Sequence, residues 1–388
     1  MKYDFDFETK RKNTNSLKWD EVDSKYPLWV ADMDFKTAPE ITLGYLKRIK
    51  EGIFGYNVLN DKFYDSYINW WDKYHHFKME KDWIIFSTGV VPSISSAVRS
   101  LTKIGDNVVI LTPVYNIFFN SIRNNKRIIL ESPLKYENYQ YEIDFDDLEQ
   151  KLSLEKTSLL IFCNPHNPIG KIWTKDELIK VGNLCKKHNV TVISDEIHCD
   201  IVRPGFEYIP FASVSDINKD ISVTLIAPTK CFNLAGMQTS AAVVANKKIK
   251  ALFERGLNTD ECAEGNTLAV ITPELAFLKG RPWLNEMNEY VFNNRDIVKE
   301  YIEKNLEGLH VIDGNATYLA WVDLNGINSK VLRDFIYKEV DVYLADGLAY
   351  GKTGEGFLRI NLATTKKRIL EALELIKKAY DKFIENNN

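Results

Sequence analysis

The middle of the chain alternates short apolar runs rich in β-branched residues with segments of helical periodicity. Between two of these runs, Thr174 and Glu177 have the spacing of a capping box. The apolar positions Leu178, Val181 and Leu184 then fall on one helical face. Alternation of this kind predicts an α/β domain with a mainly parallel sheet. The runs predicted to be strands are DWIIFST, DNVVILT, TSLLIFCN, VTVISDE, ISVTLIA and SAAVVAN.

The last hundred residues have a different pattern. A long amphipathic helix is predicted around residues 283–305, followed by the strand-like run ATYLAWVDL and by a terminal helix that begins at Lys366. A chain of 388 residues also exceeds what one hydrophobic core usually serves. We therefore expect two domains: a large one over residues 46–282, and a smaller α+β domain built from residues 1–45 and 283–388.

Composition excludes several classes of protein. The formal net charge is −4, which argues against a nucleic-acid binder that relies on an overall basic field. The five cysteines form no CxxC pair, and their odd number suits reduced thiols. The first twenty residues have no apolar core of the kind that a signal peptide needs, and no apolar run approaches the ~18 residues that span a bilayer. We expect a cytoplasmic protein without membrane or nucleic-acid partners.

The stretch STGVVPSISSAV runs from a predicted strand through Gly89 into a predicted helix. The first turn of a helix has unpaired backbone N–H groups, so a phosphate could bind there. Junctions of this kind are common, and a simple connection remains the alternative.

The stretch CNPHNPIGKIW places two Asn-Pro steps directly after an apolar run. They force an irregular turn at the carboxyl end of the sheet, which is the edge where ligands bind in open α/β sheets. Asn167 would point its amide into that crevice. The alternative is a turn with no further role.

Asp195 ends the apolar run of VISDEIHCD, and His198 follows three residues later. A buried carboxylate needs a cationic or proton-sharing partner, and a pyridinium nitrogen would meet that need. The alternative makes Asp195 a helix N-cap and His198 a hydrogen-bonded core residue. A metal site of Asp195, His198, Cys199 and Asp200 is disfavoured, because no partner cluster with ligand spacing occurs elsewhere.

Two cations are predicted inside apolar strands or at their ends. Lys230 follows ISVTLIA and Thr229, and desolvation there would lower its pKa and free the amine as a nucleophile. A lysine that forms a Schiff base, with an aspartate on the pyridine nitrogen, is the recurring pyridoxal-phosphate arrangement. Arg359 lies within EGFLRINLAT, where a buried guanidinium calls for a carboxylate. That carboxylate belongs either to a substrate or to an acidic residue of the chain.

Taken in order, these stretches resemble the fold-type I pyridoxal-phosphate enzymes of the aspartate aminotransferase superfamily over nearly the whole chain. The resemblance is strongest to the MalY/PatB-type cystathionine β-lyase (C–S lyase) branch. It rests on LWVADMDF, NPHNPIGKIW, SDEIHCDIV, TKCFNLAGMQ and GKTGEGFLRINLAT. The fold implied is a mainly parallel, seven-stranded sheet flanked by helices, with a smaller α+β domain, in a homodimer.

The resemblance also implies roles for individual residues. Lys230 would form the Schiff base with pyridoxal phosphate and act as the base at Cα, and Asp195 would pair with the pyridine nitrogen. Arg359 would bind the α-carboxylate of a small amino-acid substrate. Trp29 belongs to a group of aromatic residues, compatible with an apolar thiol substituent, that would line the entrance. At the cofactor ring, the resemblance places Asn167 and His198 near the hydroxyl and Tyr115 stacked on the ring. The phosphate would be held by Val90, Val91 and Thr229, and by Tyr56 reaching across the dimer interface. Asn167 would also contact the substrate, and Tyr56 and Tyr115 would assist catalysis.

Two positions depart from the aminotransferase pattern. Ala227 stands where a phosphate-binding serine is usual, and Gln238 stands where many aminotransferases have an arginine. Gln238 favours the C–S lyase branch. We therefore expect β-elimination from cystathionine or another S-substituted cysteine. The alternatives are an aminotransferase of an aromatic or sulfur-containing amino acid, and a regulatory protein that retains the fold.

Overall fold

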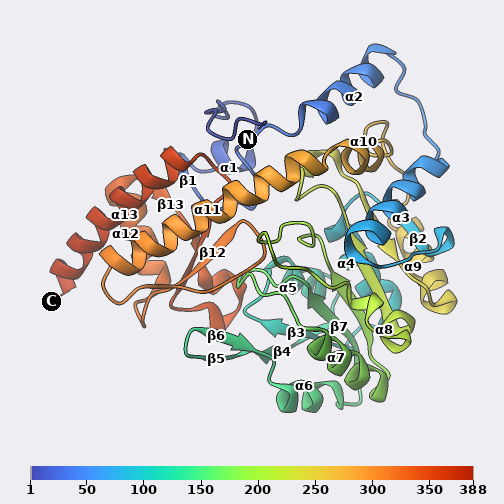
Figure 1. Ribbon diagram of the computed structural model, residues 1–388. Coiled ribbons are helices and arrows are strands. Elements are labelled where there is room, and N and C mark those ends of the chain that lie inside the picture. The colour runs from blue at the N-terminus through green and yellow to red at the C-terminus, as the bar shows by residue number, and fades with distance from the viewer. Residues whose placement is uncertain (1, 388) are drawn as a thin grey trace.

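A seven-stranded sheet forms the centre of the protein in the computed structural model, which describes residues 2–387 (Figure 1). The strand order is β2-β10-β9-β8-β7-β3-β4, and β10 alone runs antiparallel to its neighbours. This confirms the predicted mainly parallel sheet. The seven strands are β2 (Ile84–Ser87), β3 (Asn107–Thr112), β4 (Ile128–Pro133), β7 (Thr157–Cys163), β8 (Thr191–Asp195), β9 (Ser222–Ile226) and β10 (Ser240–Val243).

Both faces of this sheet are buried, because successive side chains of a strand point to opposite faces. In β3, Val108 and Ile110 belong to a different apolar cluster from Val109 and Leu111. The first cluster is covered by α4 (Val90–Leu101), α5 (Ile117–Asn124) and α9 (Lys247–Thr259). The second is covered by α6 (Phe145–Leu152), α7 (Lys175–Lys187) and α8 (Asp216–Ile221). The capping box that was predicted from Thr174 and Glu177 begins α7.

The C-terminal part of the chain contains a smaller, antiparallel sheet in the order β11-β12-β15-β14. The long helix α11 (Arg281–Asn305) crosses the molecule, and α12 (Ser329–Val340) lies beside the terminal helix α13 (Lys366–Asn387) (Figure 1). The N-terminal segment joins this part, since β1 (Tyr26–Pro27) pairs with β13 (Val342–Tyr343). The strands of the small sheet are β11 (His310–Val311), β12 (Leu319–Asp323), β14 (Ala345–Asp346) and β15 (Phe357–Asn361).

The other elements are short or peripheral. Helix α2 (Pro39–Lys50) extends away from the body of the molecule in Figure 1. Within residues 2–387, no helix has the length and apolar character needed to cross a membrane. The remaining elements are α1 (Leu17–Asp20), α3 (Asp61–His75), α10 (Thr272–Lys279), the hairpin β5 (Lys135–Glu137) and β6 (Gln140–Glu142), and the 3-10 turns η1 (Lys81–Trp83), η2 (Phe211–Ser213), η3 (Ala235–Met237), η4 (Gly347–Tyr350) and η5 (Lys352–Gly354).

All six strands that the apolar runs predicted are present, as are the long helix near residue 283 and the terminal helix from Lys366. The runs did not indicate β4, which is the edge strand beside β3. The division into domains at residues 46–282 stays a prediction.

Candidate active site

A cavity of about 280 Å³ opens at the carboxyl ends of the central strands. This is the edge at which ligands bind in open α/β sheets. The cavity brings together eight of the residues that the sequence predicted for the site: Val90, Val91, Tyr115, Asn167, Asp195, His198, Thr229 and Lys230.

Lys230 follows β9 and is partly exposed to the cavity. Its Nζ donates a hydrogen bond to the backbone oxygen of Ala31 at 2.6 Å. Burial lowers the pKa of Lys230 to about 8, although the negative charges of Asp32 and Asp195 oppose this effect. A fraction of the amine is therefore neutral near pH 7, and a neutral amine can act as a nucleophile or as a base.

Asp195 is the last residue of β8 and is 3% exposed. Among the described residues, its carboxylate accepts one hydrogen bond, from the backbone N–H of Ile197 at 3.2 Å. Burial raises the pKa of Asp195 to about 6, against the influence of that N–H and of Lys230. The carboxylate faces the cavity without a cation bonded to it, so a cationic ligand group would relieve its desolvation.

His198 lines the same cavity and is 4% exposed. Burial, together with the positive charges of Lys230 and Arg359, holds the pKa of His198 well below its usual range. The imidazole is therefore neutral, and its buried Nδ1 has no hydrogen-bond partner in the described chain. The alternative left open from the sequence, a core histidine whose ring is hydrogen-bonded within the chain, does not agree with this unpaired Nδ1.

Arg359 lies within β15 beside the cavity. Its Nη1 donates to Asn167 Oδ1 at 3.1 Å, and its Nη2 donates to the backbone oxygen of Trp29 at 2.8 Å. In the described part of the chain the guanidinium pairs with no carboxylate, and its Nε has no partner. The internal salt bridge that the sequence left open is absent among these residues. A buried guanidinium with a free donor suits an anionic ligand.

The helix α4 begins at Val90 directly after Gly89, and the first turn of a helix has backbone N–H groups without intrahelical partners. Thr229 and Gln238 lie on the wall of the same cavity. These positions form a polar end suited to an anion. Tyr115 is also on the wall, and burial, reinforced by the charge of Asp195, raises its pKa to about 12.

Three predicted residues do not line the cavity: Arg359, which lies beside it, and Trp29 and Tyr56. The Trp29 side chain donates from Nε1 to the backbone oxygen of Lys18 and packs edge-on against Tyr343, so Trp29 reaches the site through its carbonyl. Tyr56 is fully exposed and belongs to a separate hollow lined by Phe54 and Leu268. Within one chain, Tyr56 does not contribute to the site.

The sequence did not reveal the role of Ala31, whose backbone oxygen accepts from Lys230 and also from Tyr318. The only signal was the position of Ala31 within LWVADMDF. A backbone acceptor can be supplied by any residue, so its identity carries little information.

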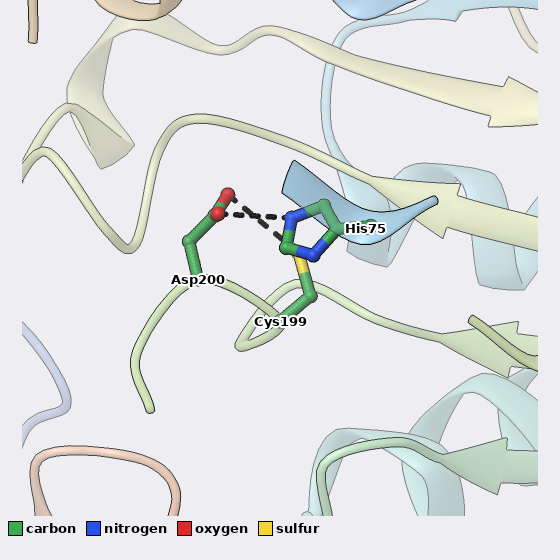
Figure 2. A group of neighbouring side chains, drawn as sticks. All are labelled: His75, Cys199 and Asp200. Atoms are coloured by element: carbon green, nitrogen blue, oxygen red, sulfur yellow. Dashed lines mark hydrogen bonds and ion pairs between the residues drawn. The ribbon is translucent and has the colours of Figure 1, made fainter. Parts of the chain in front are cut away.

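A second polar cluster lies outside the cavity, where α3 brings His75 beside Cys199 and Asp200 (Figure 2). The His75 Nε2 lies 3.0 Å from Asp200 Oδ1, and Trp70 Nε1 donates to both carboxylate oxygens at 3.0 and 3.2 Å. Although burial opposes it, the charge and hydrogen bonds of His75 and the hydrogen bond of Trp70 hold the pKa of Asp200 below its usual value. The sequence did not indicate that His75 would lie beside Cys199 and Asp200, and the hydrogen bonds of His75 and Trp70 to Asp200 account for the cluster.

The family model for class I and II aminotransferases matches residues 49–376. The chain belongs to the class I and II aminotransferase family. This family contains enzymes with different reactions, so membership alone does not select transamination.

Three relatives that match this chain over nearly its full length indicate which branch of the family it resembles. Cystathionine beta-lyase PatB of Bacillus subtilis is 39% identical over 97% of this chain and 99% of PatB. The structure of cystalysin from Treponema denticola, which contains pyridoxal 5'-phosphate, has a TM-score of 0.96 and 35% identity over 99% of this chain and 100% of that one. The pyridoxal-phosphate-bound C–S lyase of Staphylococcus hominis has a TM-score of 0.92 and 32% identity, and covers 98% of each chain. The predicted superfamily and the MalY/PatB-type branch are confirmed.

Proposed function

We propose that the protein is a pyridoxal-phosphate-dependent C–S lyase. The observation that carries this proposal is the presence of Lys230 and Asp195 in one cavity, where neither is neutralised by the other. Lys230 donates to a backbone oxygen, and Asp195 accepts from a backbone N–H. An amine of lowered pKa and a buried carboxylate without a bonded cation suit the aldehyde and the ring nitrogen of that cofactor.

The residues present fit the cofactor. Asp195 would hold the ring nitrogen, Asn167 and His198 would lie near the ring hydroxyl, and Tyr115 would pack on the ring. The first turn of α4 at Val90 and Val91, with Thr229, would hold the phosphate. When bound, pyridoxal phosphate supplies an aldehyde that links to amines and a ring that withdraws electrons from Cα.

The remaining chemistry belongs to the chain. Arg359 has a free Nε and would bind the substrate α-carboxylate, which fixes the orientation of the Cα–H bond. Asn167 holds the guanidinium through Nη1 and would border the same substrate. Lys230, with a pKa of about 8, would remove the Cα proton as a general base.

Similarity to PatB supports β-elimination as the outcome of proton removal. The Cβ–S bond would break, the thiolate would leave and take up a proton, and water would complete the conversion. In net terms, an S-substituted cysteine and water give a thiol, pyruvate and ammonium. Reprotonation elsewhere would give transamination, and the residues described above would serve both routes.

We also propose a homodimer in which Tyr56 of one protomer reaches the phosphate site of its partner. Exposed apolar side chains on α2 and the loop after it support this proposal, because contiguous exposed apolar surface marks interaction sites. These residues are Leu43, Leu46, Ile49, Ile53, Phe54, Tyr56 and Val58. Figure 1 shows α2 at the edge of the molecule, where it is available for a contact with a second copy.

Two further expectations complete the proposal. Residues 46–282 would form the cofactor-binding domain, with residues 1–45 and 283–388 as the smaller domain. The five cysteines are free, which supports a cytoplasmic enzyme.

The test is incubation of purified protein with L-cystathionine and added pyridoxal phosphate, scoring pyruvate and free thiol together. We expect both products in equal amounts without any keto acid. Lys230→Ala is the control that must lack both products. Turnover that requires a keto acid and releases no thiol would replace the lyase with an aminotransferase. Absence of any turnover, with the cellular phenotype intact in Lys230→Ala, would favour a regulatory protein.

A further inference from the structure

The backbone oxygens of residues 29–33, which we call the N-terminal strap, all accept hydrogen bonds from distant side chains. Arg359 Nη2 donates to Trp29 O at 2.8 Å, and Asn361 Nδ2 donates to both Val30 O and Asp32 O at 2.6 Å. Asn233 Nδ2 donates to Met33 O at 3.0 Å. The strap has no regular secondary structure, and side-chain hydrogen bonds to each of its five carbonyls fix its position instead.

The central carbonyl of the strap serves two donors. Ala31 O accepts from Lys230 Nζ at 2.6 Å and from the Tyr318 hydroxyl at 2.9 Å. Tyr318 is completely buried. Burial and the charge of Asp32 raise the pKa of Tyr318 well above its usual value, so the phenol stays protonated and remains a donor.

Charge alone does not fix the direction of the Lys230 amine. Asp32 and Asp195 attract it, whereas Arg359 repels it, and the neighbouring His198 is neutral. Asp32 is itself engaged by Arg11, whose Nη2 lies 2.8 Å from Asp32 Oδ2. The Ala31 carbonyl is therefore the one directional contact of the amine among the described residues.

We propose that Tyr318 and Asn361 are positioning residues for Lys230. Tyr318 fixes the Ala31 carbonyl directly, and Asn361 fixes the carbonyls on either side of it. The strap thereby presents an acceptor that orients the free amine toward the cavity. This inference rests on the proposed function, in which the amine of Lys230 acts as the base.

The two residues differ in what else they hold. Among the described residues, the Tyr318 hydroxyl donates its hydrogen bond to the carbonyl that Lys230 uses, so its removal should affect proton transfer and leave the carboxylate site intact. Asn361 donates to the carbonyl of Val30, the residue after Trp29, and the Trp29 carbonyl accepts a hydrogen bond from Arg359. Loss of Asn361 should disturb both the amine and the carboxylate site. A competing donor also weakens a carbonyl as an acceptor for an ammonium group, so removing the Tyr318 hydroxyl should make Lys230 hold its proton more tightly.

The experiment compares Tyr318→Phe and Asn361→Ser with the matched control Tyr67→Phe. Tyr67 is completely buried, and its hydroxyl has no partner in the described chain. In the holoenzyme we expect Tyr318→Phe to lower kcat about fivefold to tenfold with KM unchanged, which corresponds to one hydrogen bond. We expect Asn361→Ser to lower kcat and raise KM, and Tyr67→Phe to change neither.

A second readout does not depend on the reaction. The Lys230 amine of the cofactor-stripped full-length chain is labelled with acetic anhydride across pH and quantified by mass spectrometry. We expect the labelling midpoint to move to higher pH in Tyr318→Phe and to stay at the native value in Tyr67→Phe. An unshifted midpoint in Tyr318→Phe overturns the proposal, whatever reaction the enzyme catalyses. If Tyr318→Phe does not fold, as judged by circular dichroism, the same labelling of Asn361→Ser decides, and a native midpoint there overturns the proposal. A shifted midpoint in a protein that makes no pyruvate would instead contradict only the lyase assignment.

Discussion

Lys230 and Arg359 are bound to backbone oxygens two residues apart, at Ala31 and Trp29, with donor–acceptor distances of 2.6 and 2.8 Å. These two cations come from different sheets, since Lys230 follows β9 and Arg359 lies in β15. The strap between them therefore sets the separation of the proposed base from the proposed carboxylate site. Such spacing matters because a misplacement of about 1 Å can cost about two orders of magnitude in rate.

Arg359→Lys should raise KM about 10-fold to 100-fold and change kcat little. A lysine cannot reproduce the planar fork that contacts Asn167 and Trp29 and that we propose for the substrate carboxylate, and a lost charge-assisted hydrogen bond is worth about 1.5–3 kcal/mol. Steady-state kinetics on cystathionine checks this. The matched control is Arg295→Lys, which changes a buried arginine that donates to Leu319 O. An unchanged KM in Arg359→Lys, or an equal rise in the control, would remove Arg359 from the substrate site.

Asp195→Asn should stabilise the cofactor-free protein while greatly reducing turnover. The folded pKa of Asp195 is about 6 against an ordinary 3.8, so the native state binds a proton that the unfolded state releases. Stability therefore falls as the pH rises from about 4 to about 6. The amide removes this loss, which amounts to at most about 3 kcal/mol above pH 6. Urea unfolding of cofactor-free protein at pH 5 and pH 8 measures the stabilisation by the amide, which should be about twice as large at pH 8 as at pH 5.

Asp200→Asn is the control for that experiment, because its pKa is shifted in the opposite direction. Asp200 is also buried, but His75 and Trp70 hold its pKa below the usual value. The ionised Asp200 carboxylate therefore stabilises the folded protein above the ordinary pKa of an aspartate, and this contribution is lost as the pH falls through the lower folded pKa. We therefore expect Asp200→Asn to destabilise the protein at pH 8. Stabilisation by both substitutions would point to a general effect of removing negative charge.

The strands and the cavity could be predicted because burial leaves a clear trace in sequence. Strands such as β7 and β8 are covered on both faces and appear as continuous apolar runs. Asp195 stood out because a carboxylate at the end of such a run needs a partner. The edge strand β4 is largely half-exposed, so its run was too polar to be recognised.

Long-range contacts through backbone atoms could not be predicted. Lys230 and Ala31 are separated by 199 positions, and the acceptor is a carbonyl that every residue has. The pairing of His75 with Asp200 was missed for a related reason, since a histidine late in α3 gives no indication of which acid it will meet 125 positions later. The burial of Arg359 could be predicted from the apolar run around it, whereas the identity of its anionic partner could not.

Gln238→Arg should tighten the binding of pyridoxal phosphate about tenfold. Gln238 lines the cavity at the end that we assign to the phosphate, and a guanidinium would replace a neutral amide with a charged, bidentate donor. The dissociation constant of the cofactor can be measured by quenching of tryptophan fluorescence in the stripped protein. The control is Gln140→Arg at an exposed position of β6, which adds the same charge outside the cavity lining. Equal tightening in both variants would indicate a long-range charge effect and would leave the phosphate position without support.

Mixing two inactive variants should restore activity if Tyr56 serves the neighbouring subunit. In a hybrid of Lys230→Ala and Tyr56→Ala, one site carries both defects and the other carries none. Random exchange places half of the protomers in hybrids, so activity should return to about a quarter of the native value. The mixture is unfolded and refolded together before assay, and light scattering confirms the dimer.

The control for this recovery is a mixture of Lys230→Ala and Arg359→Ala. Both of these residues belong to the site of their own chain, since Lys230 lines the cavity and Arg359 bonds to Asn167 on its wall. Every site in that hybrid has one defect, so no activity should return. Tyr56 is fully exposed in one chain. Recovery in the mixture that contains Tyr56→Ala, but not in the mixture that contains Arg359→Ala, would show that Tyr56 acts in the active site of the neighbouring subunit. Equal inactivity of both mixtures would assign Tyr56 to its own subunit or to no site, and the exposed surface around α2 would then have to be explained without a shared active site.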